Sequence, residues 1–126
     1  MELENITKRL KDFGYEYNET TDAYSLEFAM DKVEYHILNQ TNCSEVPEGL
    51  TNIAIDMVCA EFLKIKKSFG QLSNFDFELV AQSIKLGDAT VQLSNDATPE
   101  QKFDTAINYL LSGHDDDFIR YRKMVW

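Results

Sequence analysis

Cysteine is scarce in this sequence, with only two in 126 residues, and their placement argues against a disulfide framework. Small disulfide-bonded domains usually carry about four or more cysteines at regular spacings. Cys59 falls in an apolar, helix-like pattern, where a free cysteine behaves as a small buried hydrophobe, and Cys43 falls in a polar connection. A hydrophobic core must therefore hold the fold, and a single domain of this length with 44% hydrophobic residues can build one.

Long hydrophobic runs are absent as well. No apolar stretch approaches the roughly 18 residues that a membrane span needs. The first residues, Met-Glu-Leu-Glu, are acidic and lack the pattern of a secretion signal. We expect a soluble protein made in the cytoplasm, without membrane contact.

Residue sets that carry catalysis or bind metal are also missing. The sequence has two histidines and no Ser/His/Asp set, Cys/His set, phosphate-binding glycine loop or cofactor fingerprint. Asp56 and Glu61 are five residues apart, which places them on different faces of a helix. His114 precedes three aspartates, but this cluster has neither zinc-site nor calcium-loop spacing. His36 is expected to be a helix-surface or partly buried residue and not a ligand. We therefore expect no enzymatic activity, no metal and no cofactor.

Acidic residues outnumber basic ones by 22 to 12, which gives a formal net charge of −10. General affinity for nucleic acid requires clustered Lys and Arg, so this balance argues against it. An acidic wall around a DNA channel would instead let a duplex pass without adhering, because like charges repel. The simpler interpretation is that the acidity keeps the protein in solution.

Most of the chain has helical periodicity. Apolar residues recur every three or four positions, and Gly14, Gly70 and Gly113 are typical stop residues. The sequence Thr98-Pro99-Glu100-Gln101 is a capping box with proline at the first helical position. The predicted helices are Glu2–Phe13, Asp22–Asn39, Pro47–Ser68 and a segment from Thr98 to Gly113. The fold class is therefore mainly α, a small bundle around the long third helix, which is apolar around more than half of its circumference.

The segment Gln82–Leu93 departs from this periodicity and reads as a short β-hairpin or extended loop. With Gly87 and Asp88 in the turn, Ile84, Leu86, Val91 and Leu93 share an apolar face. A two-stranded ribbon is only marginally stable alone, and the outer edges of its strands have unpaired backbone N–H and C=O groups. We therefore expect another subunit to pack against it. The apolar residues from Phe77 to Ile84 also fit helical spacing, so a helix could replace the first strand of the hairpin. We favour a short helix at Asp76–Ala81 that is followed by the hairpin.

In the last segment, 114–126, the acidic residues all precede the basic ones. Three aspartates lead, and Arg120, Arg122 and Lys123 follow. One interpretation is a final amphipathic helical turn with Asp115 or Asp116 as N-cap. The other is a docking arm, because exposed Arg, Tyr and Trp commonly anchor interfaces. The residues assigned to this arm are Phe118, Arg120, Tyr121, Arg122 and Trp126.

The order of these parts resembles the head-tail connector, or adaptor, proteins of tailed bacteriophages and prophages, a family also labelled putative DNA-packaging proteins. The motifs that carry the resemblance are spread from Leu26 onward: L-E-F-A-M-D-K-V at 26–33, I-L-N at 37–39, V-P-E-G-L at 46–50, G-Q-L at 70–72, S-I-K-L-G-D-A-T-V-Q at 83–92 and the terminal Y-R-K-M-V-W. The acidic His-Asp-Asp-Asp before the terminal motif departs from the family pattern.

The resemblance implies one connector-like domain over residues 1–126, made in the bacterial host cytoplasm and located in the virion neck. It implies a homo-oligomeric ring, usually of twelve copies, that binds the portal protein and a stopper or tail-completion protein while DNA passes through. The implied subunit core is Leu26, Met30, Val33, Ile53, Met57 and Phe62. Subunits would meet at Ile84, Leu86, Val91 and Leu93, and the arm would bind the portal.

A second function class stays open at this point. An acidic regulatory binder, such as an antitoxin-like protein, a DNA mimic or an assembly chaperone, would sequester a basic partner. That function requires acidic side chains clustered on one face, whereas here they are scattered along the sequence.

Overall fold

A computed structural model describes residues 2–70, 77 and 98–122 of the chain. Helices make up 80% of these described residues, and they contain no strand, so the predicted mainly α class is confirmed at that level. The predicted hairpin, with Ile84, Leu86, Val91 and Leu93, lies outside the described residues. Phe77 is helical, as both helical alternatives for this region require, and the residues on either side of it lie outside the described ones.

The first helix, α1 (Leu3–Asp12), ends where glycine was expected to stop it. Gly14 has a φ of 85°, a left-handed conformation that costs glycine little. Ile6 and Leu10 are buried, as their spacing predicted. Leu3 is an exception to the predicted apolar stripe, because it lies at the exposed first turn.

The second helix, α2 (Glu19–Thr41), is longer than predicted at both ends. It begins one turn before Asp22, because the Asn18 side chain caps it by accepting a hydrogen bond from a backbone N–H of the first turn. The polar residues after Ile37 do not break it. It continues through Thr41 and ends at Asn42, which adopts a left-handed φ of 54°.

The third helix, α3 (Thr51–Ser68), begins later than predicted. Pro47 does not open it; Pro47 precedes a single 3-10 turn, η1 (Glu48–Leu50), which leads into α3. Buried residues occur all round α3, from Ala54 to Lys66. The reason is that α1, α2 and α5 each pack against it.

The last two helices are α5 (Pro99–Ser112) and α6 (Asp115–Tyr121). The predicted capping box is present, since Thr98 and Gln101 each accept a hydrogen bond from the other's backbone N–H. At α6 the predicted cap is wrong: His114 occupies the N-cap position, and the aspartates lie inside the first turn. Negative charge there is favourable toward the helix dipole.

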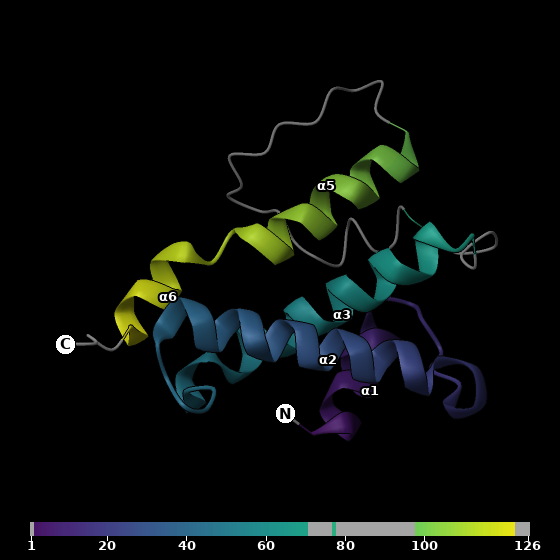
Figure 1. Ribbon diagram of the computed structural model, residues 1–126. Coiled ribbons are helices and arrows are strands. Elements are labelled where there is room, and N and C mark those ends of the chain that lie inside the picture. Colours follow the sequence, from purple (N-terminus) through teal and green to yellow (C-terminus); the bar gives the residue numbers. More distant parts are fainter. Residues whose placement is uncertain (1, 71–76, 78–97, 123–126) are drawn as a thin grey trace.

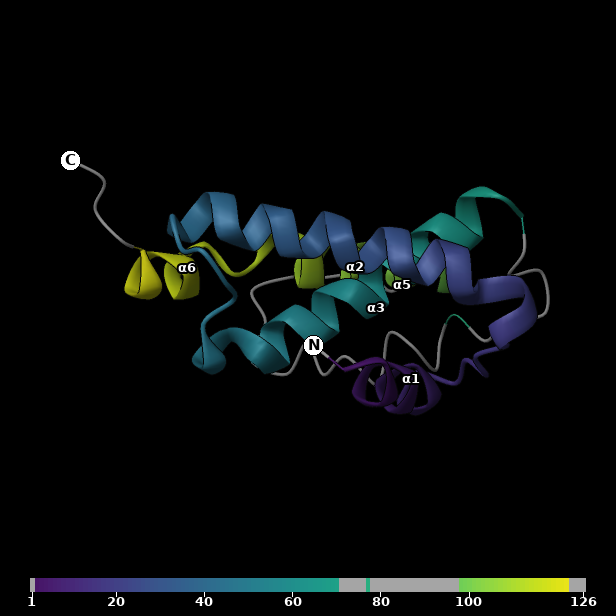
Figure 2. The same cartoon turned by 60° about the horizontal axis from the view of Figure 1, so that its bottom comes forward.

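The helices form a bundle in which α3 lies between α1 and α2, while α5 covers another side of α3 (Figures 1 and 2). α6 packs at the C-terminal end of α2 (Figure 1). Of the core residues implied by the family resemblance, Leu26, Val33, Met57 and Phe62 are buried, whereas Met30 and Ile53 are partly buried at its margin.

Candidate interaction surface

The helix α2 presents two apolar faces. Its inner face carries the buried stripe Leu26, Ala29, Val33 and Ile37. Its outer face carries Tyr24, Phe28 and Tyr35, which are 87%, 58% and 67% exposed. The spacings of four and seven residues place these three aromatic rings on one side of the helix. Exposed aromatic residues in a row are typical of an interaction surface.

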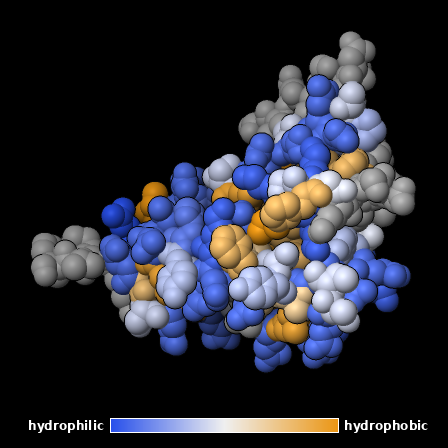
Figure 3. Space-filling model, turned by 45° about the vertical axis from the view of Figure 1, so that its right-hand side comes forward, coloured by the Kyte–Doolittle hydropathy of each residue, from blue (hydrophilic) through white to orange (hydrophobic). Residues whose placement is uncertain are grey.

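A groove of about 340 Å³ lies beside this outer face, between α2 and the end of α3. Its walls are mostly apolar and come from Tyr24, Ser25 and Phe28 on α2 and from Ile65, Ser68 and Phe69 at the end of α3. Phe69 continues the apolar pattern of the third helix in the sequence, but it is 72% exposed at the helix end. Figure 3 shows apolar side chains gathered among hydrophilic ones on one face of the molecule.

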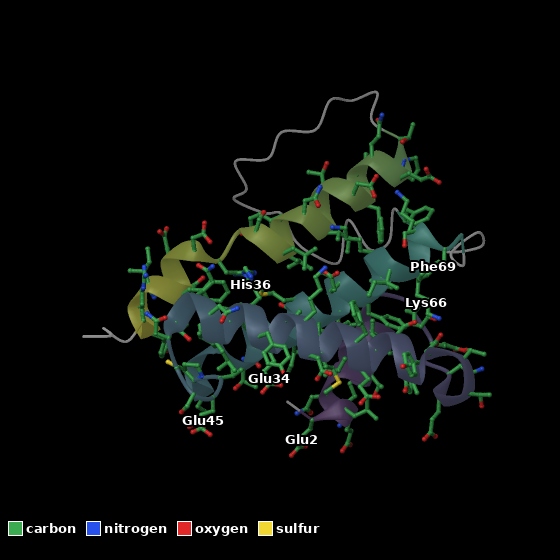
Figure 4. All side chains as sticks on the ribbon, in the orientation of Figure 1. Glu2, Glu34, His36, Glu45, Lys66 and Phe69 are labelled. Atoms are coloured by element: carbon green, nitrogen blue, oxygen red, sulfur yellow. The ribbon has the colours of Figure 1, made fainter. Side chains whose placement is uncertain are left out.

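Acidic residues flank the outer aromatic row. Glu27, Asp31 and Glu34 are exposed and follow one another at spacings of four and three, so they form a ridge along one edge of it. We call these three residues the acidic ridge. Glu34 and His36 lie on opposite sides of α2 (Figure 4).

A buried ion pair fixes the two helices where the groove forms. The Lys66 ammonium of α3 lies 2.6 Å from Asp22 Oδ1 of α2, and both side chains are almost fully buried. The other carboxylate oxygen, Oδ2, accepts hydrogen bonds from the Tyr15 hydroxyl at 2.8 Å and from the Asn18 backbone N–H at 3.0 Å. Lys66 and Phe69 both lie near the C-terminal end of α3 (Figure 4).

The network shifts the acid-base properties of its members. Burial raises the pKa of the Asp22 carboxyl, but hydrogen bonds from Lys66, Asn18 and Tyr15 outweigh burial, and the net pKa lies below its usual value. Burial and the hydrogen bond to Asp22 raise the pKa of Tyr15. Asp22 is therefore a carboxylate, and Tyr15 a neutral donor, at any ordinary pH. Both oxygens of the Asp22 carboxylate are engaged, which suits a structural anchor better than proton transfer.

Sequence reasoning missed this pair. In the sequence, Lys66 belongs to a cluster of three lysines near the C-terminal end of the third helix, where positive charge suits the helix dipole, and Asp22 begins the predicted helix 22–39. Nothing in the local pattern links two residues 44 positions apart. The outer aromatic row, by contrast, could have been found from its own helical spacing.

The C-terminal segment has one buried residue that holds it to the bundle. Phe118 is 2% exposed, and its ring centroid lies 5.9 Å from that of His36 on α2 and 6.3 Å from that of His114. Phe118 therefore belongs to the core and not to an exposed docking face. Arg120 and Arg122 are exposed, as the docking interpretation required, while Trp126 lies outside the described residues.

Further contacts tie α6 to the loop after α2 and to η1. The Cys43 thiol donates toward the Tyr121 carbonyl oxygen at 3.4 Å. Gly49 lies so close to the Tyr121 ring that a Cβ at position 49 would collide with its hydroxyl. Ile119 has no such cover and is 64% exposed. From here on, the arm means the exposed residues Ile119 to Arg122. It is narrower than the docking arm expected from the sequence, because Phe118 is buried and Trp126 lies outside the described residues.

Two carboxylates of α3 form ion pairs with neighbouring helices. Asp56 accepts a hydrogen bond of 2.7 Å from Arg9 of α1, and Glu61 accepts one of 2.7 Å from Lys32 of α2. These two carboxylates therefore face different helices, as their spacing predicted. Arg9 and Asp56 line a polar cleft of about 520 Å³ between α1 and α3. Among the described residues, no three His, Cys, Asp or Glu side chains are grouped closely enough to hold a metal ion.

The two cysteines are free and differ in environment, as expected from the sequence. Cys59 is buried, and burial, followed by the charge of Asp56, raises the pKa of its thiol to about 12. Cys43 is partly exposed. In the part of the chain that the structure describes, no helix is both long and apolar enough to cross a membrane.

Comparisons with known protein families, with curated proteins and with solved structures found no match to this chain.

Proposed function

We propose that the protein is a structural head-tail connector of a tailed bacteriophage or prophage. It forms a ring under the portal vertex, extends the DNA channel and offers the surface on which a stopper or tail component docks. Its site of action is the virion neck, after synthesis in the bacterial host cytoplasm. The sequence motifs from Leu26 to the C-terminus support this proposal, and the mainly helical fold agrees with it.

The observation that carries the proposal best is the construction of the C-terminal end. Phe118 anchors α6 in the core, so the exposed residues of the arm are presented from a fixed helix. The arm exposes Arg120 and Arg122 beside the partly exposed ring of Tyr121. Arg and Tyr are enriched among residues that dominate binding energy, which makes the arm a suitable contact for the portal.

Subunit contacts in the ring are assigned to the segment 82–93. Its apolar residues Ile84, Leu86, Val91 and Leu93 would pack where neighbouring copies meet, around bundles that each have α3 at the centre. Such head-to-tail contacts close into a ring when the rotation between copies divides a full turn. Twelve copies are the number that the resemblance implies.

The net charge of −10 per subunit fits a channel that DNA crosses without binding. In this role the protein positions other components and carries out no bond chemistry. The fully engaged Asp22 carboxylate and the paired carboxylates on α3 agree with such a role.

Electron microscopy of the purified protein, with and without the portal protein of the same phage, tests the proposal. Rings seated on portal particles, with a uniform rotational symmetry, are the expected result. The variant Arg120→Glu with Arg122→Glu should fold normally and fail to bind the portal. Particles without an added ring, at saturating amounts of the unmodified protein, would contradict the connector function.

A further inference from the structure

We propose that the outer face of α2 is a binding site for the arm of a second copy of this chain. The site consists of Tyr24, Phe28 and the groove beside them, together with the acidic ridge. The occupant is Ile119 to Arg122 of the other copy. This inference concerns the isolated protein and goes beyond the connector function, since it needs no portal.

The apolar part of the site is large for a solvent-exposed surface. Tyr24, Phe28 and Phe69 are each more than half exposed and border one groove. The side chains of Phe28 and Phe69 carry no hydrogen-bonding group, so exposure of their rings to water is unfavourable. Burial of these rings by an apolar side chain is favourable.

The charge beside the aromatic row selects among possible occupants of the site. The acidic ridge runs beside the aromatic row, and no ion pair with another described residue neutralises Glu27, Asp31 or Glu34. If two copies faced each other through antiparallel α2 helices, their acidic ridges would meet, and this contact would be repulsive. The site therefore favours a basic occupant with an apolar side chain.

The C-terminal end of the chain has this character, whereas the segment before α5 does not. Between positions 71 and 97 the sequence has four acidic residues and one basic residue, so that segment has the wrong charge for the ridge. From Phe118 to the C-terminus it has three basic residues and none acidic. In the described part of that stretch, Ile119 is the exposed apolar residue, and Arg120 and Arg122 stand on either side of Tyr121.

The arm meets the ridge more readily in another copy than in its own. α6 packs on α2 through Phe118 and His36. Glu34, at the ridge, lies on the opposite side of α2 from His36 (Figure 4). Docking of α6 therefore holds the arm away from the ridge of the same chain.

Contacts of this type join two different surfaces and are heterologous. Each copy then offers one arm and one site, so association continues from copy to copy and closes only if the rotation allows it. Opposite charges at the contact predict that salt weakens it. Because one arm fills one site at a time, a portal that binds the arm would compete with this association.

Sedimentation velocity of the full chain over a wide concentration series tests the proposal. The expected result is a weight-average mass that rises above the 14.6 kDa of one chain with concentration, and falls when salt is added. Arg120→Glu with Arg122→Glu, or Glu27→Arg with Asp31→Arg, should each weaken association by about tenfold or more. Combining the two pairs restores opposite charges and should recover association.

The matched control is Glu2→Arg with Glu45→Arg, which changes the net charge by the same amount at exposed positions outside the site (Figure 4). It should leave association unchanged. A protein that stays monomeric at every concentration would overturn the proposal. So would association that the arm variant leaves intact while Phe28→Ser removes it, because the face would then bind another occupant. Neither result depends on portal binding, so the connector function is judged separately.

Discussion

Lys66 and Asp22 form an ion pair of 2.6 Å whose two side chains are almost fully withdrawn from water. This pair joins the last turn of α3 to the first turns of α2 at the groove. Removal of one partner leaves the other as an uncompensated buried charge, and in proteins this typically costs about 3–5 kcal/mol.

The first prediction compares the loss of one partner of this ion pair with the loss of both. Lys66→Met should lower the free energy of unfolding by about 3 kcal/mol or more, because the Asp22 carboxylate loses its cation. Adding Asp22→Leu to this variant should recover part of the loss, since no charge then stays buried, while the Tyr15 hydroxyl and the Asn18 N–H lose their acceptor. Urea denaturation followed by circular dichroism measures both.

The matched control for this prediction is Lys67→Met. Lys67 pairs with Asp104 at the same distance, 2.6 Å, but at a more exposed position. An exposed pair contributes about 1 kcal/mol or less. Equal losses from the two lysine variants would show that burial of the Asp22 pair has no special effect.

A second prediction concerns acid. The pKa of Asp22 is lower in the folded chain than in the unfolded one, so its carboxylate stabilises the fold above the usual aspartate pKa of about 3.9. That contribution should disappear as the pH falls through the folded pKa. The stability gap between the unmodified protein and Asp22→Asn should therefore be constant near neutral pH and shrink below about pH 4. A gap that grows on acidification would contradict the lowered pKa.

The third prediction distinguishes the buried Phe118, which holds α6 on the bundle, from the exposed arm next to it. Phe118→Ala should remove α6 from α2, because the ring fills a buried site between His36 and His114. Loss of a buried phenylalanine typically costs about 3–5 kcal/mol, with the lower end expected for a terminal helix. Hydrogen exchange should accelerate at 115–121. Ile119→Ala, at the exposed neighbouring position, should leave that exchange unchanged.

A fourth prediction follows from the cysteines. In the native protein, Cys43 should react with a thiol reagent, while Cys59 should not, because burial raises its pKa to about 12 and closes it to the reagent. Titration with the reagent should detect one rapidly reacting thiol per chain in buffer and two in denaturant. With Cys43→Ser, the fast group should vanish; persistence of fast labelling at Cys59 would show that α1 and α3 separate readily.

The sequence alone predicted those features that short segments encode. The capping box at Thr98, the glycine stop after α1 and the buried stripe of α2 follow from contacts between residues within a few positions of one another. The mainly α class follows from the same local periodicity. The bounds of α2 and α3 were less accurate, since Asn18 and the 3-10 turn after Pro47 compete with other start signals nearby.

The tertiary structure alone decided which of these residues meet water and which meet each other. It buried Lys66 against Asp22 and Phe118 against His36, and it left Phe28 and Phe69 exposed around one groove. The composition of each segment is compatible with either outcome for these side chains. Burial depends on how distant helices pack, and packing is a property of the whole chain that no local pattern contains.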